Sequence, residues 1–91
     1  MRILAELYGL GPVEVAVLEF LLENDFSSVR EISDALGIPS PDVSSALRRL
    51  ERANLVVAHR PWGERLFRPR RNLIAHVLEA ARRAISHKAV S

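Results

Sequence analysis

The sequence predicts a mainly α-helical domain with one small β-hairpin, and three segments support this fold class. Residues 28–54 carry the boundary signals of two helices joined by a short turn. Residues 12–24 form an apolar segment of helical length, and residues 55–68 hold two β-rich runs on either side of a turn-like sequence. A chain of 91 residues is long enough for one domain with a core of three or four helices.

The N-terminal part is predicted to form two helices. Residues 2–8 have apolar side chains at helical spacing and end before Gly9, so we expect a short helix that packs on a partner or on the last helix. The next helix begins at Pro12, which suits the first helical position, and ends near Asn24. Glu14 lies in its first turn, where the helix dipole favours an acidic group. Because this helix is apolar around most of its circumference, it needs cover on more than one side.

A helical pair is predicted to follow a short extended link at residues 26–29. Ser28 and Glu31 match the S-x-x-E capping box, which satisfies backbone N–H groups at the start of a helix. Gly37 is suited to the left-handed backbone conformation that ends a helix. These signals place the first helix of the pair between Ser28 and Gly37.

The second helix of the pair is predicted over residues 41–53 and is amphipathic. We expect Ser40 to be its N-cap, Pro41 to be its first residue, and Asn54 to be the left-handed residue that ends it. The side chains of the apolar face are Val43, Ala46, Leu47 and Leu50. The side chains of the opposite face and its flanks are Pro41, Ser44, Ser45, Arg48, Arg49 and Arg52. A helix that is buried on one side and presents Ser and Arg on the other is suited to a polyanion.

Residues 55–69 are predicted to form a β-hairpin. Its strands are residues 55–60 and 65–68, and Pro69 ends the second strand. The side chains expected to face inwards or to pair across the strands are Val56, Leu66 and Phe67. Trp62, at the tip, either packs back onto the hairpin or the last helix, or wedges against a sugar–phosphate backbone; packing is the preferred interpretation. The arginines of this region are Arg60, Arg65, Arg68, Arg70 and Arg71.

The last helix is predicted to have Asn72 as its cap and to reach about Ser86. Its apolar arc includes Leu73, Ile74, Val77, Leu78, Ala81 and Ile85. Because this arc exceeds what one small core absorbs, we expect it to pair with its symmetry mate in a homodimer, with help from residues 3–8. The alternative is a monomer in which the last helix covers the helix at 12–24.

The distribution of charge predicts an anionic partner. The net charge of the chain is +2, but residues 1–47 hold two basic and eight acidic residues, whereas residues 48–91 hold eleven basic and three acidic ones. The second half therefore carries a net charge of +8, which favours binding of an anion on one face. Most of these cations are arginines, which suit bidentate contacts with phosphate or guanine. The absence of Cys, Gln and Thr is a weak indication of a thermophile.

Several function classes are not supported by the sequence. Without cysteine there is no disulfide, thiolate zinc site or thiol nucleophile, and the three histidines have no ligand spacing. No motif for catalysis or for a cofactor occurs, so we expect neither an enzyme nor a bound cofactor or metal. No apolar run is long enough to span a bilayer, and residues 1–8 lack the features of a signal peptide. We therefore expect a cytoplasmic protein with no membrane partner.

The order helix, short strand, helix, turn, helix and hairpin resembles a winged helix-turn-helix domain over about residues 10–70. The resemblance is carried by Gly-Pro-Val-Glu-Val-Ala-Val-Leu-Glu-Phe-Leu, by Val-Arg-Glu-Ile-Ser-Asp-Ala-Leu-Gly-Ile, and by Val-Ser-Ser-Ala-Leu-Arg-Arg-Leu-Glu-Arg-Ala-Asn-Leu-Val. The last run resembles the recognition helix and the entry to the wing of MarR-, ArsR- and TrmB-like bacterial and archaeal regulators. Where those families often place Gly after this helix, the chain has Asn54, which tolerates the same backbone.

This resemblance implies a homodimeric transcriptional regulator that binds double-stranded DNA. Residues 1–9 would be an N-terminal extension, residues 10–71 the winged helix DNA-binding domain, and residues 72–91 the dimerisation helix. The recognition helix at 41–53 would enter the major groove, and the wing at 55–69 would lie on the backbone or in the minor groove. The side chains expected to contact DNA are Ser40, Pro41, Ser44, Ser45, Arg48, Arg49, Arg52, Arg60, Arg65 and Arg68.

Arg48 is the leading candidate for base recognition, because an arginine can donate two hydrogen bonds to guanine. The alternative is an arginine face that is simply solvated. Two other functions are compatible with the same fold, namely a protein-interaction module that binds no DNA, and nonspecific binding of chromatin or RNA. The concentration of arginine on one helix and the hairpin counts against the first of these two.

Overall fold

The computed structural model describes the backbone of residues 1–90 and the side chains of residues 1–85. The elements are α1 (Arg2–Tyr8), α2 (Pro12–Asn24), α3 (Val29–Leu36), α4 (Ser40–Arg52), β1 (Val56–His59), β2 (Leu66–Pro69) and α5 (Arg71–Val90). This order, with β1 and β2 paired antiparallel, confirms the predicted fold class of a winged helix-turn-helix.

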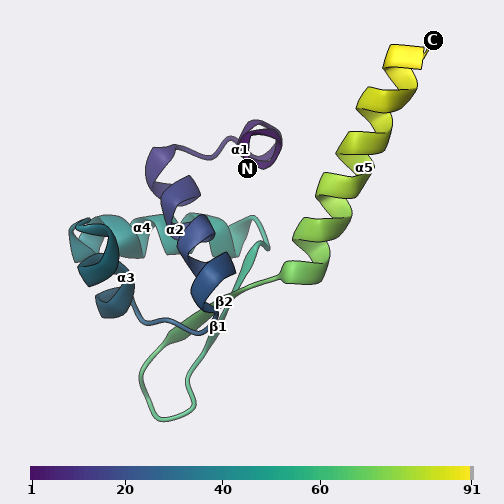
Figure 1. Cartoon of the computed structure of the whole chain (residues 1–91). Coiled ribbons are helices and arrows are strands. Elements are labelled where there is room, and N and C mark those ends of the chain that lie inside the picture. Colours follow the sequence, from purple (N-terminus) through teal and green to yellow (C-terminus); the bar gives the residue numbers. More distant parts are fainter. Residues whose placement is uncertain (91) are drawn as a thin grey trace.

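The helices α2, α3 and α4 form a body from which the hairpin and α5 both project (Figure 1). The helix α2 packs against α4, α3 and β2, so its wide apolar circumference is covered on more than one side, as expected. The helix α1 lies against α5, which leaves the body and gives the molecule its long dimension of 51 Å. The buried core takes Leu4 from α1, several side chains each from α2 and α4, and Phe67 from the hairpin.

Local signals set most of the helix boundaries. At the start of α3, the backbone N–H of Glu31 donates to Ser28 Oγ at 3.1 Å, and the N–H of Ser28 donates to Glu31 Oε1 at 2.9 Å, which confirms the capping box. Gly9 and Gly37 take the left-handed conformation that ends α1 and α3, with φ of 64° and 67°. Asn54, which follows the C-cap residue Ala53 of α4, has φ of 65°, the left-handed conformation expected of it.

Two predicted caps are wrong. The helix α4 begins one residue earlier than expected, because the carbonyl of Pro39 accepts from the N–H groups of Asp42 and Val43 at 3.0 and 3.1 Å. Pro39 is therefore the N-cap, and Ser40 is the first helical residue. Likewise Asn72 lies inside the first turn of α5. That helix continues past the expected end near Ser86, since no Gly or Pro interrupts the sequence before Val90.

The hairpin register decides which of its side chains reach the core. Val56 pairs with Pro69 and Ala58 with Phe67, and these residues form the inner face of the hairpin. Leu66 lies on the outer face, because alternate residues of a strand face opposite sides. Of the two placements expected for Leu66, the structure therefore has the cross-strand pairing, with His59, and not the inward orientation. The extended link before α3 contributes one bridge, in which Ser27 and Phe67 exchange backbone hydrogen bonds of 3.0 and 2.8 Å.

Trp62 does not pack against the hairpin or α5. Its side chain is 89% exposed at the hairpin tip, so the preferred interpretation of a packing residue is wrong. Pro61 and Gly63 flank Trp62 in the loop between β1 and β2, and Gly63 has φ of 90°.

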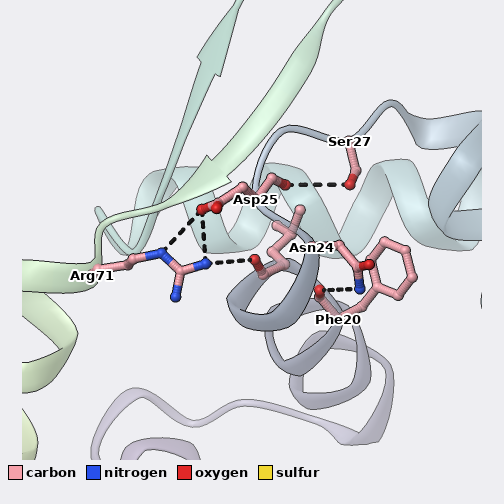
Figure 2. A network of polar contacts seen from close by, with 6 residues as sticks. Phe20, Asn24, Asp25, Ser27 and Arg71 are labelled. Carbon is pink, nitrogen blue, oxygen red and sulfur yellow. Dashed lines mark hydrogen bonds and ion pairs between the residues drawn. The ribbon is translucent and has the colours of Figure 1, made fainter.

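A polar network joins the end of α2 to the start of α5 (Figure 2). The guanidinium of Arg71 donates to Asp25 Oδ1 at 2.7 and 3.0 Å, and to the carbonyl of Leu21 at 3.4 Å. Asp25 itself has φ of 51° and ψ of −131°, a backbone conformation that favours glycine. The chain therefore holds a strained aspartate at the point where its carboxylate can bind Arg71.

The balance between strain and ion pairing at Asp25 can be measured. Strain of this kind costs about 1–3 kcal/mol, whereas a pair as exposed as Asp25–Arg71 contributes about 0–1 kcal/mol. We therefore expect Asp25→Gly to raise the free energy of unfolding by about 1 kcal/mol, and Asp25→Asn, which keeps the strain, to lower it slightly. Urea unfolding followed by circular dichroism measures both, and a glycine variant less stable than the asparagine variant would contradict the assignment of strain.

Candidate nucleic-acid interface

The helix α4 is buried along one face and presents its polar residues on the other. Its four apolar residues Val43, Ala46, Leu47 and Leu50 belong to the core. Ser44 is half-buried at the edge of the polar face. The exposed residues of this helix include Ser40, Pro41, Ser45, Arg48, Arg49 and Arg52. The helical period thus separates an anchoring face from a face available to a partner.

Arg48 of α4 and Arg65 of the wing lie on the same side of the molecule. Both line one surface hollow of about 310 Å³, together with Ser44, Glu51 and Phe67. This is the arrangement that a shared anion-binding surface requires, because cations from two separate elements converge there. A recognition helix and a wing on opposite sides would have excluded such a surface.

Arg65 is also held by contacts within the chain. Its Nη2 atom lies 2.9 Å from Glu51 Oε1, and its guanidinium lies 5.0 Å from the centroid of the Phe67 ring. The ion pair connects the residue before β2 to the C-terminal half of α4, and the contact with Phe67 holds Arg65 on the hairpin. Arg65 therefore braces the wing against α4, in addition to its position beside Arg48.

Arg49 and Arg52 belong to a different part of the surface. Arg49 Nη1 lies 3.1 Å from Glu14 Oε1, and that carboxylate, which is almost fully buried, also accepts the N–H of Gly11 at 3.1 Å. Both arginines line a hollow of about 230 Å³ beside Tyr8. Arg49 compensates a buried charge that would otherwise be costly, which gives it a structural role that the sequence did not reveal.

The remaining arginines lie along the wing and its exit. Arg60 is exposed next to the hairpin tip. Arg68, on the outer face, donates from Nε to His59 Nε2 at 3.0 Å. Arg70 and Arg71 lie with Arg68 around a hollow of about 440 Å³ between β2 and α5. Neither Arg70 nor Arg71 was among the expected contact residues, although both belong to the basic run that follows the wing.

The apolar arc of α5 is only partly used within the chain. Ile74 is buried in the core, and Leu73, Val77 and Leu78 pack against it. Ala81 is half-buried and Ile85 is 57% exposed, so the exposure of the apolar side chains increases along the helix from Ile74 to Ile85. Leu7 of α1 is also exposed, at 60%.

Charged residues occupy another part of α5. Arg82 and Arg83 approach Glu79 Oε1 at 2.6 and 3.3 Å. The hydrogen bond from Arg82 lowers the pKa of the Glu79 carboxyl below its ordinary value, and in turn Glu79 raises the pKa of Arg82. These pairs mark a solvated side of the helix.

The part of the chain that the structure describes has neither a membrane-spanning helix nor a cluster of metal-ligating side chains. Within residues 1–90, no helix combines the length and apolar character needed to cross a membrane. Across the side chains that the structure describes, no three His, Asp or Glu residues gather so that they could hold a metal ion.

Comparison with known proteins relates the chain to a family. The family model that matches the chain is that of the MarR family, over residues 8–61. The match includes α2, α3, α4 and β1, and therefore the helix that carries Arg48. No curated protein matches the sequence.

Solved structures show the same fold. One is a MarR family protein from Bacillus stearothermophilus, with 24% identity and a TM-score of 0.67; the match covers 94% of this chain and 64% of that chain. This chain thus spans less than two thirds of that relative. The protein ST1889 from the thermoacidophilic archaeon Sulfolobus tokodaii has 20% identity and a TM-score of 0.73, with coverage of 97% and 91%. Rv0081 of M. tuberculosis has 27% identity and a TM-score of 0.67, with coverage of 97% and 90%.

The contacts of Arg65 with Glu51 and Phe67 should reduce the local opening of the hairpin. Arg65→Ala removes both the ion pair with Glu51 and the contact with Phe67, so the strand amides should exchange about two- to fivefold faster with solvent. Native-state hydrogen exchange of β1 and β2 measures this effect. Arg60→Ala, which removes an exposed arginine of the same hairpin, is the matched control and should leave exchange unchanged. Equal protection in the Arg65 variant would show that the wing is held by its backbone and core contacts alone.

Proposed function

The chain belongs to the MarR family, and we propose that it is a transcriptional regulator that binds specific sequences in double-stranded DNA. The helix α4 would enter the major groove, which is about 12 Å wide and admits an α-helix. The wing would lie on the backbone or in the adjacent minor groove.

The observation that carries this proposal is the hollow shared by Arg48 and Arg65. Arg48 is exposed on a helix whose opposite face is fixed in the core, which suits a guanidinium that must meet a base edge in a defined position. Ser44 and Ser45 beside it are suited to hydrogen bonds with bases or phosphates. Arg60, Arg65 and Arg68 supply positive charge on the wing side.

The three arginines of α4 have different roles in this proposal. Arg48 would donate to a guanine, whereas Arg52, at the C-terminal end of the helix, would reach the phosphate backbone. Arg49 could contribute to the positive potential while it remains bound to Glu14. Ser40 and Pro41, at the start of α4, would contact the bases or the adjacent phosphates.

We further propose that two chains form a symmetric dimer through α5. The exposed end of the apolar arc at Ile85, together with Leu7, supports this assembly, because both are large apolar side chains left in contact with solvent. A twofold dimer would present two α4 helices to half-sites about one DNA turn apart.

The base-recognition role of Arg48 can be tested on DNA selected from a random library by the unaltered protein. Arg48→Ala should weaken binding to the selected duplex by roughly 1–3 kcal/mol and relax the preference at one base pair. Fluorescence anisotropy at fixed salt gives the affinities. Arg83→Ala, which removes one exposed arginine from α5, controls for the loss of charge and should bind as the parent does. If the Arg48 variant has the same affinity and the same base preference as the unaltered protein, Arg48 is a solvated residue without a role in recognition. If the unaltered protein binds random duplex or RNA as tightly as the selected duplex, its recognition is nonspecific.

The dimer proposal is tested by mass. Light scattering at high micromolar concentration should give twice the 10.2 kDa of one chain. Ile85→Glu should give a monomer, because it places a charge in the apolar contact. Ala80→Glu adds the same charge at another exposed position of α5 and should remain dimeric. A monomeric mass for the unaltered chain would refute the assembly.

A further inference from the structure

The outer face of the wing carries an apolar surface that the contacts described so far do not use. Phe26, His59, Arg60, Pro61, Trp62 and Leu66 line a hollow of about 620 Å³. Trp62 is 89% exposed and Phe26 is 53% exposed. The Phe26 ring meets His59 edge-on, with ring centroids 5.5 Å apart, so the two rings pack against each other in the wall of the hollow.

Trp62 stands out among these residues because the fold does not require it. A hairpin tip is normally polar, and an indole left exposed there forgoes the free energy that burial of its apolar surface would contribute. The turn around Gly63 projects the residue beyond the body of the protein, where Figure 1 shows the hairpin loop extending away from the helices. Such a position is suited to reaching a partner rather than to stabilising the chain.

The charges around this surface indicate the chemistry of the partner. Arg60 lines the hollow itself, and Arg68 lies on the same outer face. From residue 56 to residue 71 the chain has five arginines and one acidic residue, Glu64. The partner should therefore be an anion that also offers apolar or planar surface. DNA meets both conditions, since its phosphates flank deoxyribose edges and base steps.

We propose that Trp62 is an apolar contact in the minor groove of DNA, with Arg60 beside it on the adjacent phosphates. This inference rests on the proposed DNA-binding function. With α4 in the major groove, the wing tip is the element that reaches the neighbouring minor groove. Apolar side chains in that groove act as wedges that partly unstack a base step. The wing would thereby detect how easily the DNA deforms, in addition to the bases read by α4.

The chain offers a direct probe, because Trp62 is its only tryptophan. Titration of the protein with its selected duplex should change the intensity of the indole emission and reduce its quenching by acrylamide. Binding is followed in parallel by the anisotropy of labelled DNA. Saturated binding with unchanged emission and unchanged acrylamide quenching would refute the contact.

Variants separate an apolar contact from an ionic one. Burial of about 60 Å² of apolar surface corresponds to roughly tenfold in affinity, so Trp62→Ala should bind about tenfold more weakly, and Trp62→Phe should recover part of the loss. Neither change should alter the salt dependence, because no phosphate charge is lost. Arg60→Ala is the matched comparison and should lower the slope of log affinity against log salt by about 0.9. Circular dichroism verifies that each variant is folded.

The response to DNA deformability completes the test. Duplexes that carry a TA step where the wing lies should bind more tightly than duplexes with an A-tract there, and Trp62→Ala should lose that difference. If the unaltered protein binds duplex DNA but Trp62→Ala binds equally well, the wing-tip contact is refuted and the DNA-binding function stands. If the unaltered protein binds no duplex, the proposed function itself fails and the surface must serve another partner.

Discussion

The burial of one face of α4 against the rest of the body is the constraint on which this structure depends. A helix of 13 residues is only marginally stable alone, so its packing on α2 both forms it and orients it. Because the helical period fixes the opposite face, the same packing determines that Ser45 and Arg48 point outwards. A change in the buried face would therefore move the exposed face as well as reduce stability.

The arginines of the basic second half of the sequence have distinct structural roles. Arg48 is exposed, Arg65 links the wing to α4 through Glu51, and Arg49 is bound to the buried carboxylate of Glu14. The charge pattern predicted a basic surface but could not separate these roles. Glu14, for example, is far from Arg49 in the sequence, and the two residues meet only in the folded chain. Arg49 joins α2 to α4 at the interface that positions Arg48, so a residue expected to contact DNA also supports the helix that would do so.

The parts of the fold that could be predicted are those set by neighbouring residues. The capping box at Ser28 and the left-handed residues Gly37 and Asn54 depend on a few adjacent groups, and the structure has all three. The side of the hairpin that Leu66 occupies depends instead on its register with β1, and a shift of one residue reverses it. In the candidate interface, too, the features set by neighbouring residues could be predicted and those set by tertiary contacts could not. The faces of α4 were predictable from periodicity, whereas the hollow that joins α4 to the wing arises from tertiary packing.

The strained backbone at Asp25 shows how the body and α5 are coupled. Glycine would adopt the observed φ of 51° with less strain, but it has no carboxylate to receive Arg71. At this position glycine would relieve the backbone strain, whereas aspartate provides the carboxylate that binds Arg71. The three hydrogen bonds of Arg71, two to Asp25 and one to the carbonyl of Leu21, attach the first turn of α5 to the end of α2. Since α2 packs directly on α4, the contact connects the direction of α5 to the helix that carries Arg48. In the proposed dimer that direction would set the separation of the two α4 helices, which explains why a strained residue is suited to this junction.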